Sequence, residues 1–145
     1  MLDLLITNGQ CVLPSGLAAV DIGIAGQKIV SIGAPGTLAA AGRTVDAKGG
    51  LVIPGGIDPH IHCSSAIKMS AADPAKFTDP PSQVSRAALW GGTTTLIDFV
   101  QCTHERSIQQ AIEQTDAIWK GDCYCDYGWH LTLMGAIPQV QFGEV

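Results

Sequence analysis

The clearest pattern of hydrophobic and polar residues lies in the second half of the chain. Residues 108–119 place mostly apolar side chains three and four positions apart, which predicts an amphipathic helix with one face toward a core. This stripe consists of Ile108, Ala111, Ile112, Thr115, Ile118 and Trp119. Residues 82–90 predict another helix, which the following Gly91-Gly92 would end with a left-handed turn.

Three further segments have the composition of strands. The run 51–58 is apolar without polar alternation, which is typical of a strand buried on both faces. Residues 93–100 are β-branched and apolar, and residues 126–133 predict one more strand after the amphipathic helix. A polar loop over residues 63–81 would connect the first of these strands to the first helix.

This alternation of strands and helices predicts an α/β fold with parallel strands and right-handed crossovers. Either a doubly wound sheet or the opening of a (β/α)8 TIM barrel would fit. A complete barrel needs about 250 residues, whereas this chain has 145 and stops after roughly two and a half units.

The first fifty residues have a different pattern. Residues 2–7 and 10–13 predict two strands joined by Asn8-Gly9, which is a strong hairpin signal. Residues 19–24 and 28–32 predict a second pair of strands around a turn. We therefore expect a small antiparallel sheet of hairpins here, and a boundary near residue 50.

Composition narrows the functional classes. Lys and Arg number 8 against 13 Asp and Glu, for a net charge of −5, so no nucleic-acid partner is expected. No apolar run is long enough to span a membrane, and the N-terminus lacks the pattern of a signal peptide. The five cysteines are odd in number and irregularly spaced, which favours reduced thiols and a cytoplasmic location.

The candidate chemistry lies in residues 58–62, Asp-Pro-His-Ile-His, after the first apolar strand. Successive side chains of a strand point to opposite faces, so His60 and His62 should share one face. Two imidazoles on one face can converge on one metal ion, and imidazole nitrogen suits zinc and similar metals. The alternative is a pair of core histidines whose hydrogen bonds are satisfied.

Two motifs resemble one protein family. Residues 54–62, Pro-Gly-Gly-Ile-Asp-Pro-His-Ile-His, resemble the first-strand signature of the dihydropyrimidinase/hydantoinase branch of the amidohydrolase superfamily. Residues 91–99, Gly-Gly-Thr-Thr-Thr-Leu-Ile-Asp-Phe, resemble the second strand of that branch. Residues 4–9, 21–24 and 28–29 resemble its N-terminal β-domain, so the likeness extends over essentially the whole chain.

The resemblance implies a metal-dependent hydrolase that opens a hydantoin or dihydropyrimidine ring to an N-carbamoyl amino acid. It also implies that residues 1–50 are the N-terminal part of a composite β-sandwich domain. Residues 51–145 would then form the first strands and helices of a (β/α)8 TIM barrel, which is incomplete in this chain. The full-length form would be a homotetramer.

The family holds two divalent metals, usually zinc. The resemblance implies that the ligands are the two first-strand histidines, a bridging carbamylated lysine, two later histidines and an aspartate. Only His60 and His62 carry over as ligands. The other ligands and the catalytic aspartate would lie beyond residue 145, so we expect this chain alone to be inactive.

The residues on either side of the two histidines are expected to support the site without binding the metal. Asp58 is expected either to orient a histidine or to make a strand-end hydrogen bond. Ser64 and Ser65 belong to the loop that shapes the substrate pocket in the family, and here this loop is smaller and more polar than in typical hydantoinases. Cys63 is expected to be a packing thiol, because strand alternation points it away from His62.

No site role is expected for the other histidines or for Asp98. His104 is expected to be exposed at the start of a helix, and His130 to be a core histidine within a buried strand. Asp98 lies at the end of the second strand and is assigned no role. The competing functions are a dihydroorotase, an allantoinase or a deaminase on the same fold, or a non-catalytic scaffold related to dihydropyrimidinases. The presence of both His60 and His62 argues against the scaffold.

Overall fold

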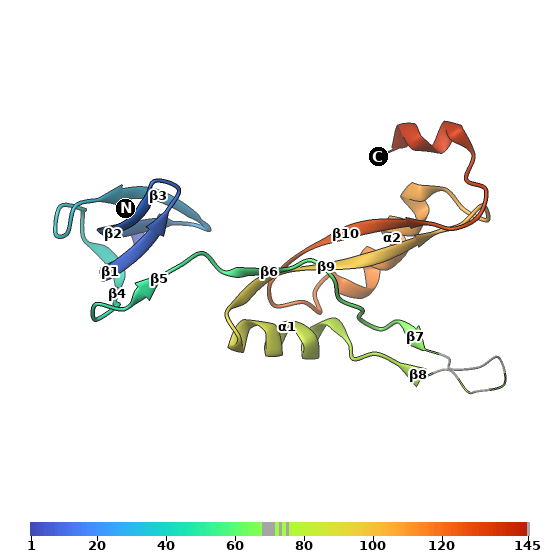
Figure 1. The fold of residues 1–145 in the computed structure, drawn as a ribbon, viewed down its shortest axis with the longest axis horizontal. Helices are drawn as coiled ribbons and strands as arrows, with labels where there is room; N and C mark the ends of the chain where they lie inside the picture. Colours follow the sequence, from blue (N-terminus) through green and yellow to red (C-terminus); the bar gives the residue numbers. More distant parts are fainter. Residues whose placement is uncertain (68–71, 73, 75, 145) are drawn as a thin grey trace. The chain divides into compact units, whose positions relative to one another are not determined.

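The computed structural model describes residues 1–67, 72, 74 and 76–144. The chain divides into two compact units, Met1–Pro54 and Gly55–Val145, and each is described by itself (Figure 1). No helix in the described part of the chain is long and apolar enough to cross a membrane. The five cysteines are free thiols.

The first unit is a five-stranded sheet with the order β3-β2-β1-β4, in which β5 also pairs with β1. Its strands are β1 (Leu2–Leu13), β2 (Gly16–Ala25), β3 (Lys28–Gly33), β4 (Ala41–Asp46) and β5 (Leu51–Val52). The pairs β1–β2 and β2–β3 are antiparallel, whereas β4 and β5 run parallel to β1. The sheet is therefore mixed, and the prediction of antiparallel hairpins alone is wrong.

The predicted hairpin at Asn8-Gly9 is also wrong, because β1 continues straight through these residues. A two-residue hairpin of this type needs a positive φ at both central residues. Asn8 has a φ of 56°, but Gly9 is not in the left-handed region, and the pair forms an irregularity in the β1–β2 register instead. A Cβ on Gly9 would lie 2.5 Å from Val52 Cγ2, so close packing accounts for the glycine.

The second unit contains a parallel sheet with the order β10-β9-β6. Its strands are β6 (Gly56–Asp58), β9 (Thr93–Cys102) and β10 (Asp126–Leu133), and the helices α1 (Pro81–Trp90) and α2 (Ile108–Trp119) pack against β9. The predicted helices and the parallel strand–helix alternation are thus confirmed (Figure 1). The short strands β7 (Ala66–Ile67) and β8 (Lys76–Phe77) pair antiparallel within the predicted loop, and a 3-10 helix covers Gln139–Glu144.

The single buried strand predicted over residues 51–58 does not form. Its first residues belong to β5 in the first unit, and its last residues form β6 in the second. Ile53 lies between these strands and is 62% exposed, and Ile57 is 63% exposed because β6 is an edge strand with only β9 beside it. The apolar run therefore supplies two separate strands.

The two faces of β9 contact different parts of the unit. Its buried side chains recur at every second position from Leu96 to Cys102, and Val100 and Cys102 pack with Ile108 and Ala111 of α2. Leu96 packs with Trp119 at the other end of α2. The opposite face of β9 carries Phe99, around which the candidate site is arranged.

Candidate metal-binding site

The histidine segment stays attached to β9 after β6 ends at Asp58. The backbone N–H of Ile61 donates to Ile97 O at 3.2 Å, so the extended conformation continues through the histidines. Ile61 packs toward the cluster of Leu96 and Trp119, whereas both histidine rings lie against Phe99 on the other side. The expected alternation therefore holds.

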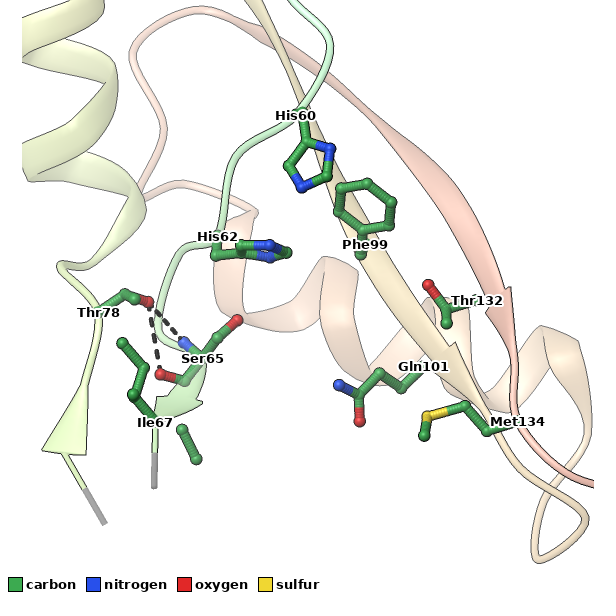
Figure 2. A pocket seen from close by; sticks show the side chains of 10 residues that line it. His60, His62, Ser65, Ile67, Thr78, Phe99, Gln101, Thr132 and Met134 are labelled. Carbon is green, nitrogen blue, oxygen red and sulfur yellow. Dashed lines mark hydrogen bonds between the residues drawn. The ribbon is translucent and has the colours of Figure 1, made fainter. Parts of the chain in front are cut away.

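Phe99 is the centre of a ring cluster, and together with His60 and His62 it lines a cavity of about 480 Å³ (Figure 2). Its ring centroid lies 4.5 Å from that of His60 and 5.2 Å from that of His62. The cavity is also lined by Ser65 from the loop after the histidines and by Thr132 from β10. Residues from three parts of the second unit thus meet at the carboxyl ends of parallel strands, where active sites of α/β folds are built.

The spacing of the two imidazoles suits a shared metal ion. A zinc–nitrogen bond of about 2.0–2.1 Å places a ring centre about 3.2 Å from the ion, so two ligands at a tetrahedral angle have ring centres about 5.2 Å apart. The ring centroids of His60 and His62 are 5.2 Å apart, with an angle of 86° between the ring planes. Within the described residues, no third His, Cys, Asp or Glu joins them in a cluster that could hold the ion.

The carboxylate of Asp98, for which no role was expected, lies next to the His62 ring. Its side chain is buried, and its Oδ1 lies 3.7 Å from His62 Nδ1. Its two oxygens accept the backbone N–H groups of Cys63 at 2.9 Å and Phe99 at 2.7 Å, which fixes the carboxylate in place. A carboxylate behind a histidine favours a proton on the near nitrogen and leaves the far nitrogen free for a metal.

Asp58 makes a strand-end hydrogen bond. Its Oδ1 accepts the backbone N–H of His60 at 3.1 Å, so it fixes the backbone of that histidine rather than its ring. This contact corresponds to one of the two expectations for Asp58 and sets the direction in which the chain leaves β6.

Ser64 and Ser65 lie in a constrained loop beside the histidines. Ser64 has a φ of 50°, an unusual conformation for a residue other than glycine, and its N–H donates to Asp79 O at 3.0 Å. The N–H of Ser65 donates to Thr78 Oγ1 at 2.8 Å (Figure 2). Both serines line a second cavity of about 350 Å³, and Ser65 lines the first as well.

Cys63 is buried in the core beside Leu96 and Trp119, which confirms the prediction of a packing thiol. Burial is the main cause that raises the pKa of this thiol to about 12, with a smaller contribution from the nearby Asp98 carboxylate. The thiol therefore stays protonated and is a poor metal ligand at neutral pH.

The prediction for His130 is wrong. It is exposed rather than buried, because β10 is an edge strand of the sheet, and its Nε2 lies 2.9 Å from Pro59 O. Its ring centroid is 5.1 Å from that of Phe99, so it joins the ring cluster. His104 is exposed, as predicted, but it lies in a turn before α2 rather than at the start of the helix. Asp98 and Phe99 meet the histidines, and His130 meets Phe99, only through the pairing of β6, β9 and β10, which no local sequence signal specifies.

Comparison with known proteins supports the relationship that the motifs indicate. Residues 43–131 match the model of the Amidohydrolase family. The D-hydantoinase of Rhizobium radiobacter is 37% identical over 139 residues, and that of Ralstonia pickettii is 36% identical over the same length. Each alignment covers 96% of this chain and 29% of the relative.

A solved structure shows the same relationship in three dimensions. A crystal structure of D-hydantoinase matches with a TM-score of 0.81 at 33% identity, over 99% of this chain and 30% of that one. The chain thus spans less than a third of the length of these relatives, and the resemblance to the dihydropyrimidinase/hydantoinase branch is confirmed. Since the family model covers more than half of its residues, the chain belongs to the amidohydrolase family.

Proposed function

We propose that this chain carries the first two metal ligands, His60 and His62, of a hydrolase that opens a cyclic amide ring. The substrate is a hydantoin or dihydropyrimidine, and the product is an N-carbamoyl amino acid. The proposal depends chiefly on one observation. Two imidazoles line one cavity with their ring centroids 5.2 Å apart, which matches the spacing of two ligands on one ion.

The chemistry requires a metal that the protein residues hold and orient. When bound, a divalent ion would polarise the ring amide carbonyl and activate water to attack it. The Asp98 carboxylate, 3.7 Å from His62 Nδ1, would favour the proton on that nitrogen, and Asp58 holds the backbone of His60. The wall that contains Ser65 and Phe99 positions the ring beside the histidines. The net reaction adds water across the C–N bond, with hydroxyl on the carbonyl carbon and hydrogen on the ring nitrogen.

The finer features implied by the resemblance are part of the same proposal. Residues 51–145 would be the first units of a (β/α)8 barrel, and residues 1–50 part of a composite β-sandwich domain. The parallel order β10-β9-β6 supports the barrel. Zinc as the metal, a second ion, a homotetramer and further ligands outside these 145 residues stay predictions.

A substrate panel tests the function. The full-length protein should hydrolyse hydantoin or dihydrouracil, and a chelator should remove the activity. Dihydroorotate and allantoin are included because they separate the competing activities. Turnover of only dihydroorotate or allantoin would reassign the substrate, and turnover that persists after complete metal removal would contradict the metal-dependent mechanism.

A further inference from the structure

A second cavity lies next to the histidine pair and contains an arginine. It has a volume of about 350 Å³ and is lined by Arg106 together with the polar side chains of Ser64, Ser65 and Gln101. Ser65, Phe99 and Gln101 line both this cavity and the one that contains the histidines (Figure 2). The two cavities are therefore neighbours, and one ligand can extend from the first into the second.

Arg106 lacks a charged partner within the part of the chain that the structure describes. One of its terminal nitrogens donates to the side-chain oxygen of Gln114 on α2. Its Nε is buried without a hydrogen-bond partner, and no described carboxylate forms an ion pair with it. A guanidinium offers five N–H donors, and leaving a buried donor unpaired is costly. The guanidinium therefore has an unbalanced positive charge beside the cavity, and an anion bound in the cavity would balance it.

Asp98 lines the same cavity but does not neutralise Arg106. Its oxygens are engaged by the backbone N–H groups of Cys63 and Phe99 and face His62. The charge of Asp98 is therefore used to hold the histidine segment, while the charge of Arg106 remains available to a ligand.

The loop of Ser64 and Ser65, which lines this cavity, has an unusual backbone conformation. Ser64 has a φ of 50°, and the backbone bonds to Asp79 and Thr78 fix the loop against the second half of its hairpin. Strain of this kind is retained where the surrounding structure determines it, often at a ligand site. The loop therefore gives the cavity a fixed polar wall.

We propose that the cavity around Arg106 is a subsite for an anionic group on the substrate, in particular a carboxylate on a short side chain of the ring. The planar guanidinium matches a carboxylate in a two-point contact. This inference rests on the proposed ring-opening function and narrows its substrate class to cyclic amides with an acidic substituent.

The test compares two substrates that differ only in charge: 5-(2-carboxyethyl)hydantoin and its primary carboxamide. In the full-length protein, Arg106→Gln should lower kcat/KM for the acid by about tenfold or more, since a charge-assisted hydrogen bond is lost. The value for the carboxamide should stay within about twofold. Arg86→Gln is the matched control, because Arg86 lies over the Tyr124 ring outside this cavity.

Equal losses for both substrates in Arg106→Gln, or no loss for either, would overturn the subsite. The proposed function fails only if hydantoin and dihydrouracil are not hydrolysed either. If neither carboxyethyl compound is hydrolysed, calorimetric titration with succinate tests the subsite separately. Succinate should bind the wild type more tightly than Arg106→Gln. Equal binding, or no binding to the wild type, would overturn the subsite even without enzymatic activity.

Discussion

Asp98→Asn is the substitution that tests most sharply how the structure prepares His62 for a metal. It keeps the size of the side chain and removes the negative charge 3.7 Å from His62 Nδ1. Two full charges at this distance would attract each other by about 4.5 kcal/mol at an effective dielectric constant of about 20, which is an upper bound because a metal-binding imidazole is neutral. The side chain of His62 is 51% exposed, so solvent screening reduces this value substantially.

Loss of a carboxylate behind a metal-binding histidine lowers metal affinity by about 10- to 100-fold, or about 1.4–2.7 kcal/mol. We expect the loss of metal affinity in Asp98→Asn to fall in this range, which lies below the value of about 4.5 kcal/mol for two full charges. The measurement is competition for Zn²⁺ between the full-length protein and a chromophoric chelator. The substitution should also lower the free energy of unfolding by about 1–3 kcal/mol, because an amide has only one oxygen for the N–H groups of Cys63 and Phe99.

Asp122→Asn provides the control for this experiment. Asp122 also accepts a backbone N–H, from Ser82 at 3.1 Å, but it is not part of the histidine cavities. It should lose stability without losing metal affinity. Equal Zn²⁺ affinity for the wild type and Asp98→Asn would refute the role assigned to Asp98.

Three further predictions concern stability, each checked by urea or thermal unfolding. Gly92→Ala should lower the free energy of unfolding by about 1–2 kcal/mol, because Gly92 has a φ of 84°. Gly91→Ala should lower it far less, because Gly91 has a right-handed helical conformation. Equal losses for the two variants would contradict this. Ser107→Ala should lower the free energy of unfolding by about 1 kcal/mol, since it removes the side chain that caps α2 and accepts the N–H of Gln110. An unchanged unfolding midpoint would contradict this role of Ser107. The folded state raises the pKa of Cys63 from 9.0 to about 12, so the free energy of unfolding should fall as pH rises between these two values. Cys63→Ala should lack the part of this decrease that the thiol causes. The same pH dependence in the wild type and the variant would disprove this prediction.

The regular elements of the second unit were predictable because local signals agree there. Residues 108–119 have an apolar stripe, and Ser107 completes a capping box at its start, so α2 spans the predicted residues. The strand at 126–133 likewise forms as predicted. When the pattern, the caps and the neighbouring turns indicate the same structure, the sequence is sufficient to place an element.

Other elements depend on contacts that a sequence pattern does not contain. Residues 41–46 form β4 although nearly all of their side chains are exposed, because they pair with the open edge of β1. The run 51–58 was predicted as one buried strand, but its residues pair with β1 at one end and with β9 at the other. Hydrophobicity indicated strands there and did not indicate which neighbours they would have.

The same limit applies to the candidate site. The spacing of His60 and His62 was sufficient to place both rings on one side of the chain, since strand alternation is a local property. Asp98 and His130 are far away in sequence, and their positions depend on the pairing of β6, β9 and β10. Their participation could therefore be found only from the tertiary structure.

The central claim is that His60 and His62 bind a metal ion, and the most direct test is the metal content of the purified full-length protein. His60→Ala should lose about one equivalent of metal per chain relative to the wild type, as measured by plasma mass spectrometry. His104→Ala is the matched control, since His104 is exposed in a turn away from the histidine cavity, and it should retain the full metal content. A metal content in His60→Ala equal to that of the wild type would contradict the account.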